Sequence, residues 1–155
     1  EAIRSYRSIT GMPDIGDRAA SRRSDGTVAF TLVDEEPVFG VNSNSPAYTA
    51  SDEAAAERMR DILVKLYPEV MRADNLGWKP NDALFHAEAT ALLRAAGVRR
   101  NSLAGRTVSI SVDRKLCRSC EEVLPKMGVE LGNPTVRFQD PHGRVKTMKD
   151  GRWLD

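Results

Sequence analysis

Cysteine and histidine are scarce in this sequence, so the few that it holds narrow the chemistry it can perform. The 155 residues include two cysteines and two histidines. No apolar run is long enough to cross a membrane, and the first residues, Glu1 to Arg4, lack the charged-then-apolar order of a signal peptide. We therefore expect no membrane segment in this chain.

A strong net charge is also missing. The formal net charge is +1, so the molecule as a whole offers no strong attraction to nucleic acid. The sequence contains no internal repeat, no low-complexity tract and no phosphate-binding glycine loop. Ser43 and Ser45 lack a histidine and aspartate constellation around them, so serine catalysis is not expected.

The composition is that of a single soluble domain. Hydrophobic residues make up 41% of the chain and charged residues 29%, and the length suffices to bury a core. We expect one domain over residues 1–155. Residues 1–25 contain Gly11, Pro13 and Gly16 without a sustained apolar period, which predicts an irregular N-terminal arm.

Periodicity predicts an α/β fold with a mixed five-stranded sheet. Short runs of β-branched and aromatic residues indicate strands, and apolar residues at helical spacing indicate helices. Ser51 is the expected N-cap of the first helix, and Pro68 should end it. Gly97 and Gly128 should end the other two helices. The expected strands are residues 27–33, 38–41, 107–112, 135–138 and 144–147, and the expected helices are residues 52–67, 86–96 and 117–127.

A turn near the C-terminus predicts how the last two strands pair. Residues 140–143 read Asp-Pro-His-Gly, which suits a type I turn. This segment is too short to hold a helix, so the strands on either side of it should run antiparallel. His142 in such a turn is expected at the surface rather than among metal ligands.

The residues with most chemical potential lie in two short motifs. His86 and Glu88 form H-A-E, and Cys117 and Cys120 form C-R-S-C after a strand-like run. A C-x-x-C pair alone fits a disulfide, a redox pair or half of a metal site, and a strand followed by a helix that begins at the cysteines is also a thioredoxin-like arrangement. The upstream histidine and glutamate favour a metal, because a dithiol redox site has no use for them.

These four residues suit a hydrolytic zinc site. Cys117 and Cys120 at a helix start can both face one metal as thiolates, with His86 as a neutral imidazole ligand. The fourth position stays open for water, and Glu88 would be the general acid/base. Two residues along a helix point to nearly opposite sides, so His86 and Glu88 can share a site only if the helix begins at or near His86.

The two motifs resemble those of the zinc-dependent nucleobase deaminases, whose general signature is H-x-E followed by P-C-x-x-C. Within that superfamily the chain is similar to bacterial deaminase toxin domains, in particular the branch that acts on cytosine in single-stranded DNA. The resemblance covers residues 26–155, and Leu116 departs from it because many relatives have proline there. It implies a cytidine deaminase-like three-layer fold, and the short final turn is typical of the group with toxin and free-cytidine deaminases.

The resemblance also implies a function and a setting. The implied reaction is zinc-dependent hydrolytic deamination of cytosine to uracil in single-stranded DNA, by the effector domain of an interbacterial toxin. Such a toxin is delivered from the producing bacterium into the cytoplasm of a target bacterium, and a cognate immunity protein protects the producer. The chain begins at Glu1 without an initiator methionine, which would suit a domain at the end of a delivery protein and suits any expressed fragment equally.

Several residues are candidates for substrate contacts. In the deaminases an asparagine after the second strand commonly touches the target nucleotide, and Asn42 is similar to it, with turn chemistry as the alternative. Trp78 would stack on a base or cap the edge of the core. Phe85 lies next to the histidine, and Arg114 and Arg118 belong to a basic run that would bind phosphates or lie solvated in loops. The basic run comprises Arg94, Arg99, Arg100, Arg106, Arg114, Lys115 and Arg118.

Two other functions remain open at this point. A deaminase of RNA or of free nucleosides would use the same four residues, and a compact closed pocket would favour nucleosides. A small zinc-stabilised binding module would keep the metal ligands but make no chemical use of Glu88. Replacing Glu88 by alanine would abolish deamination and leave such a module intact.

Overall fold

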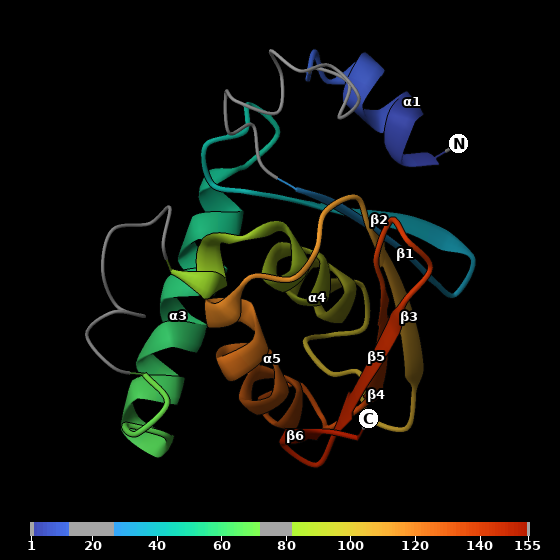
Figure 1. Cartoon of the computed structure of the whole chain (residues 1–155). Helices are drawn as coiled ribbons and strands as arrows, with labels where there is room; N and C mark the ends of the chain where they lie inside the picture. The colour runs from blue at the N-terminus through green and yellow to red at the C-terminus, as the bar shows by residue number, and fades with distance from the viewer. Residues whose placement is uncertain (1, 13–26, 72–81, 155) are drawn as a thin grey trace.

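The computed structural model describes residues 2–12, 27–71 and 82–154. Its helices and strands are interspersed along the chain, as expected of an α/β fold (Figure 1). The helices are α1 (Ala2–Ile9), α3 (Ala50–Leu66), the 3-10 helix η2 (Ala83–Phe85), α4 (Ala87–Val98) and α5 (Arg118–Glu130). The strands are β1 (Val28–Val33), β2 (Glu36–Val41), β3 (Thr107–Val112), β4 (Thr135–Gln139), β5 (Val145–Lys149) and β6 (Arg152–Trp153).

The strands form one mixed sheet in the order β2-β1-β3-β4-β5-β6. Among the described strands, only β3 and β4 pair in parallel, and the last strands run antiparallel, as the turn at residues 140–143 predicts. In that turn the Gly143 N–H donates to the Asp140 carbonyl, and the exposed His142 lies at the surface, as expected. The expected count of five strands is wrong by one, because β6 adds a two-residue strand paired with β5.

Strand β6 is anchored by a hydrogen bond to a helix carbonyl that lacks its usual donor because of a proline. Pro125 lies inside α5 and has no N–H, so the carbonyl of Glu121 one turn earlier loses its helical donor. The indole N–H of Trp153 donates to that carbonyl at 2.7 Å. A two-residue strand carries no period of its own, which is why sequence patterns do not predict β6.

The predicted first hairpin is confirmed, but its turn is shorter than the sequence predicts. Strands β1 and β2 pair antiparallel, with Val33 opposite Glu36. Asp34 and Glu35 both adopt positive φ, of 52° and 68°, which is the conformation of a two-residue turn matched to strand twist. Pro37, expected in the turn, belongs to β2, an edge strand where a missing N–H is tolerated.

Helices α4 and α5 cover one face of the sheet, and α3 packs on the outside of α4 (Figure 1). Gly40 of β2 faces α4 so closely that an added Cβ would lie 2.5 Å from the Ala91 nitrogen. The next side chain along the strand, Phe39, points to the opposite face, where it stacks on Tyr6 of α1. Helix α1 therefore lies on the other side of the sheet from α4.

The expected three-layer arrangement holds only at the β1–β2 end of the sheet. Strand β3 alternates buried Val108, Ile110 and Val112 with exposed residues on the opposite face. Those exposed residues are small and polar, which is typical of a sheet face in contact with water. Among the described elements, only α1 covers part of this face, beside β1 and β2.

The prediction of an irregular arm over residues 1–25 is wrong for its first part, because residues 2–9 form α1. Tyr6 packs on Phe39, and Arg7 is 3% exposed and pairs with Asp113. Eight residues are too few to display a helical period convincingly, and the tertiary contacts stabilise the helix instead. Residues 13–25 of the expected arm lie outside the described residues.

Helix α3 begins two residues earlier than expected. Thr49 rather than Ser51 is its N-cap, and the Thr49 hydroxyl accepts from the Asp52 N–H while the Asp52 carboxylate accepts from the Thr49 N–H. This reciprocal pair is a capping box. The helix ends at Leu66, two residues before Pro68, as the proline predicts.

Neither glycine expected to end a helix does so. Gly97 lies within α4, whose reversal of direction uses positive φ at Arg100 and Asn101 instead. Gly128 lies within α5, and the reversal there uses Gly132 with a φ of 97°. Among the described helices, none is both long and apolar enough to span a membrane.

Candidate metal centre

His86 stands at the start of α4 rather than inside it. Its φ of −92° and ψ of 165° are extended, so it is the N-cap, and the helix begins at Ala87. The short helix η2 leads into it, and η2 is itself capped by Asp82, whose carboxylate accepts from the Leu84 N–H. The helix thus begins directly after His86, which is the condition for a shared site. Because the His86 backbone is not helical, its imidazole and the Glu88 side chain need not point to opposite sides.

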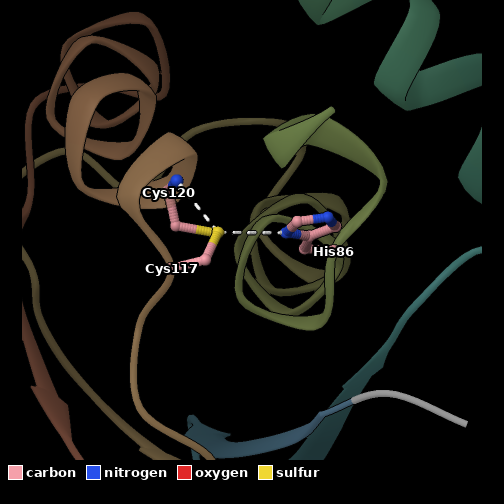
Figure 2. A group of neighbouring side chains, drawn as sticks. All are labelled: His86, Cys117 and Cys120. Atoms are coloured by element: carbon pink, nitrogen blue, oxygen red, sulfur yellow. Dashed lines mark hydrogen bonds between the residues drawn. The ribbon is translucent and has the colours of Figure 1, made fainter. Parts of the chain in front are cut away.

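The two cysteines occupy the equivalent place on α5. Cys117 is the N-cap, and its sulfur accepts from the Cys120 N–H at 3.3 Å. The His86 Nδ1 atom lies 3.3 Å from the Cys120 sulfur and 3.5 Å from the Cys117 sulfur. Figure 2 shows the imidazole and the Cys117 sulfur meeting between the facing ends of the two helices. The described residues thus bring together all three expected metal ligands, with the ligand atoms within 4.8 Å of one another.

The spacing of these atoms fits zinc. Zn–S bonds of about 2.3 Å and a Zn–N bond of about 2.05 Å place tetrahedral sulfur and nitrogen ligands about 3.5 Å apart. The distances from the His86 Nδ1 atom to the two sulfurs are 3.3 and 3.5 Å, so they match without rearrangement. Two sulfurs and one imidazole are donors that zinc prefers, and three protein ligands leave a fourth position for another molecule.

The cysteines are electrostatically unequal. The hydrogen bond with Cys120 and the contact with His86 lower the pKa of the Cys117 thiol to about 4. The hydrogen bond with Cys117, together with burial, raises the pKa of the Cys120 thiol well above its ordinary value. Cys117 is exposed and Cys120 is buried.

Glu88 lies in the first turn of α4 and is 2% exposed. Burial raises the pKa of its carboxyl to about 7, while the charge of His86 lowers it and those of Cys117 and Asp113 raise it. Glu88 is thus a buried carboxyl two residues after His86, in the first turn of the helix that His86 caps.

Asn42 is tied to the start of α4. Its side-chain oxygen accepts from the Ala87 N–H at 3.0 Å, which satisfies a backbone donor that has no partner inside the helix. One turn later, the Thr90 hydroxyl donates to the Val41 carbonyl at 2.8 Å. Both bonds fasten the first turn of α4 to the end of β2. Asn42 is therefore next to the centre, with an observed structural contact, and its contact with a nucleotide stays a prediction.

Two aromatic candidates fare differently. Phe85 is fully buried in the main core, and the Arg60 guanidinium lies 5.6 Å from its ring centroid. Its ring has no exposed surface and packs in the core, and its contact with a substrate stays a prediction. Trp78 lies outside the described residues.

The basic run divides into structural and surface residues. Arg94 donates to the Asp52 carboxylate and to the carbonyls of Phe39 and Ala47, so it anchors the loop after β2. Arg99 and Arg106 both pair with Asp34, at the far end of the sheet from the cysteines. These three arginines are therefore engaged within the fold, and the choice between phosphate binding and solvated loops stays open for Arg114, Lys115 and Arg118.

The remaining cations near the cysteines are Arg114, Lys115 and Arg118. Arg114 is half-buried, and Arg118 has an 89% exposed side chain that pairs with Glu122 at 3.5 Å. Sequence reasoning missed two further cations, Arg144 and Lys146, which the last hairpin brings close to Lys115. They line a pocket of about 300 Å³ together with Val112, Lys115, Leu116, Glu121, Phe138 and Asp140.

Asp113 is the other residue that sequence reasoning missed. It follows β3, accepts from the Val28 N–H at 2.8 Å and from the Arg7 side chain at 2.8 Å, and its charge acts on Glu88. Nothing in its local sequence distinguishes it from a solvated loop aspartate, since both partners are distant along the chain.

Comparisons with known proteins add no identification. No protein-family model matches the sequence, and no curated protein matches it significantly. Any assignment of function therefore rests on the geometry of His86, Glu88, Cys117 and Cys120 and on the resemblance of their motifs.

Proposed function

We propose that this chain is a zinc-dependent deaminase that converts cytosine to uracil in single-stranded DNA. The observation that carries the proposal is the convergence of one imidazole and two sulfurs at the facing ends of α4 and α5, with a buried carboxyl in the next turn. A structural zinc site needs only ligands. A buried glutamate in the first turn of the helix that His86 caps is what proton transfer adds to that requirement.

His86, Cys117 and Cys120 would hold the metal. Bound there, zinc supplies Lewis acidity that makes a water molecule nucleophilic near neutral pH. His86 directs Nδ1 toward both sulfurs, so Nδ1 is the ligand atom and the ring proton belongs on Nε2. Asn42 and Thr90 hold the α4 backbone on β2, which keeps the imidazole and the carboxyl at a constant separation.

Glu88 carries the protons of the reaction. It accepts one from the attacking water and delivers it to the ring nitrogen next to C4, then accepts the remaining proton from the hydroxyl now bonded to C4 and delivers it to the departing amino group, so that water and cytosine become uracil and ammonia. Its burial separates the carboxyl from bulk water, which lets it exchange protons with the reacting atoms instead of the solvent.

The cations around Cys117 support a polynucleotide as the substrate. Arg114, Lys115 and Arg118 flank the cysteine in sequence, and the adjoining pocket adds Arg144, while Lys146 of that pocket pairs with Glu121 at 3.0 Å. Such a group neutralises phosphates, so binding should weaken as salt rises. The target must be single-stranded or flipped out of a duplex, because the reactive atom is inaccessible inside a stack. Free nucleosides and RNA are the alternatives, and the same salt dependence would distinguish a polynucleotide from a nucleoside.

The toxin role extends the proposal by resemblance. As an effector domain, the protein would be delivered into the cytoplasm of a target bacterium and damage its DNA, and the producer would carry a cognate immunity protein. Expression of the chain in a bacterium without that protein should raise cytosine-to-thymine mutations. Expression of the Glu88→Ala variant should leave the mutation rate unchanged.

The direct test offers the zinc-loaded protein four substrates in parallel: single-stranded DNA, double-stranded DNA, RNA and free cytidine. We expect uracil in the single-stranded DNA, and we expect Glu88→Gln to lower the rate by a factor of about 10² to 10⁴ while zinc remains bound. The matched control is Glu122→Gln, which removes a partly exposed carboxylate of α5 and should leave the rate unchanged.

Two outcomes would contradict the proposal. If the zinc-loaded protein converts none of the four substrates, the centre is that of a zinc-stabilised binding module. If Glu88→Gln and Glu122→Gln lower the rate equally, Glu88 has no special part in proton transfer.

A further inference from the structure

Helix α1 reaches the metal centre through one buried ion pair. The Arg7 Nε atom donates to the Asp113 carboxylate at 2.8 Å, and the two side chains are 3% and 10% exposed. Asp113 uses its other carboxylate oxygen to accept from the Val28 N–H at 2.8 Å, and its own N–H donates to the Val28 carbonyl. The aspartate is thus held from two sides, by β1 and by α1.

The position of Asp113 gives this ion pair its importance. It is the first residue after β3, and only three residues separate it from Cys117. The connection from β3 to α5 leaves the sheet at the end where α1 lies (Figure 1). A segment this short limits how far Cys117 can lie from Asp113, because each residue spans at most about 3.6 Å. The placement of Asp113 therefore limits where the cysteine sulfur can stand.

Apolar packing alone does not close α1 over this end of the sheet. A cavity of about 540 Å³ lies between the first residues of α1 and the ends of β3 and β4, and Asp113 is part of its wall. Tyr6 secures α1 farther away, by stacking on Phe39 of β2. The ion pair is thus a direct link between α1 and the segment before the cysteines.

We propose that Arg7 is a positioning residue for the metal centre, which acts through Asp113 to hold the segment that carries Cys117. This inference rests on the proposed zinc site. It assigns to α1 a contribution to metal affinity, in addition to any contribution to folding. Groups that orient metal ligands typically change metal affinity by a factor of about 10 to 100 when removed.

The experiment measures zinc affinity by competition with a chromophoric chelator, and cysteine ligation by the sulfur-to-metal absorption of the Co²⁺-loaded protein. We expect Arg7→Met and Asp113→Asn each to weaken zinc binding by about tenfold or more and to reduce the cobalt band. The double variant should lose no more than either single one, because both act through the same contact. Arg7→Lys should restore part of the affinity.

The matched control is Arg106→Met. Arg106 directly precedes β3, whereas Asp113 directly follows it. Arg106 pairs with Asp34 at 2.7 Å, so its substitution by methionine removes an arginine–aspartate pair at the opposite end of the strand. Its zinc affinity should equal that of the unmodified protein. Thermal unfolding of the metal-free variants separates a loss of affinity from a loss of stability.

The inference is overturned if Arg7→Met binds zinc as tightly as Arg106→Met, whatever its stability. If Arg7→Met fails to fold, the double variant takes its place, since it leaves no unpaired buried charge, and unchanged affinity there overturns the inference equally. Failure of the unmodified protein to bind zinc would overturn both the proposed function and this inference. Zinc binding without deamination would overturn the proposed function alone.

Discussion

Gly40 offers the sharpest test of how the fold holds the centre. It lies in β2 opposite the first turns of α4, where an added Cβ would overlap the Ala87 carbonyl oxygen and lie 2.5 Å from the Ala91 nitrogen. Both neighbours are helix backbone, which cannot rotate away as a side chain can. Gly40→Ala must therefore push α4 off the sheet, and with it His86 and Glu88.

The magnitude follows from the rigidity of that contact. Overpacking by one methyl group costs about 1–3 kcal/mol in a core that adjusts. Because the obstruction is backbone, we expect Gly40→Ala to cost about 3 kcal/mol, the upper end of that range. For a chain of this size this corresponds to a fall in Tm of about 6–12 °C.

Thermal and denaturant unfolding of the metal-free protein measure this cost, and chelator competition measures the effect on zinc affinity. The matched control is Gly97→Ala, on the exposed part of the same helix, where an added Cβ meets nothing within 4 Å. That substitution should stabilise the protein by about 0.5–1 kcal/mol, because it removes the entropic cost of glycine in a helix. A Gly40→Ala variant as stable as the unmodified protein would refute the close approach of α4 to β2.

Two further predictions concern contacts that support the site. Burial raises the pKa of Asp52, but hydrogen bonds from Arg94 outweigh it, so the folded-state pKa is lowered and the pair stabilises the protein fully above a pH of about 4. Asp52→Asn should therefore reduce the free energy of unfolding at pH 7, and the difference from the unmodified protein should vanish as the pH falls through the lowered pKa in acid denaturation series; a constant difference would refute the assignment. Trp153→Phe should cost about 1–3 kcal/mol in urea unfolding, because the Glu121 carbonyl loses its donor. That cost should shrink in a Pro125→Ala background, which returns a helical N–H to the same carbonyl, and an equal cost in both backgrounds would contradict this explanation.

The secondary structure could be predicted best where local pattern and tertiary contact agree. Strand β3 covers the predicted residues 107–112, because its alternation of small polar and apolar residues matches a sheet with one covered face. The predictions failed at helix ends, where single residues decide. Thr49 displaced Ser51 as N-cap because only Thr49 has the extended backbone and the reciprocal contact with Asp52.

The candidate centre could be predicted because its residues are rare and their types are restrictive. Two cysteines three apart and a histidine two residues before a glutamate leave few alternatives, and the distances around the His86 Nδ1 atom agree with that expectation. The surroundings of the centre could not be predicted in the same way. The basic residues of the run cannot be told apart by sequence. In the structure Arg99 and Arg106 pair with Asp34, whereas Lys115 lines a pocket beside the cysteines.

The sequence by itself predicted the cluster of His86, Cys117 and Cys120 and the antiparallel final hairpin, because these depend on residue type and short spacing. Tertiary structure decided the burial of Phe85, the ion pair between Arg7 and Asp113 and the donor that Trp153 supplies to Glu121. Each of these joins residues far apart along the chain. A pairwise contact of that kind leaves no period and no local motif, since its energy appears only once the backbone has brought the two partners together.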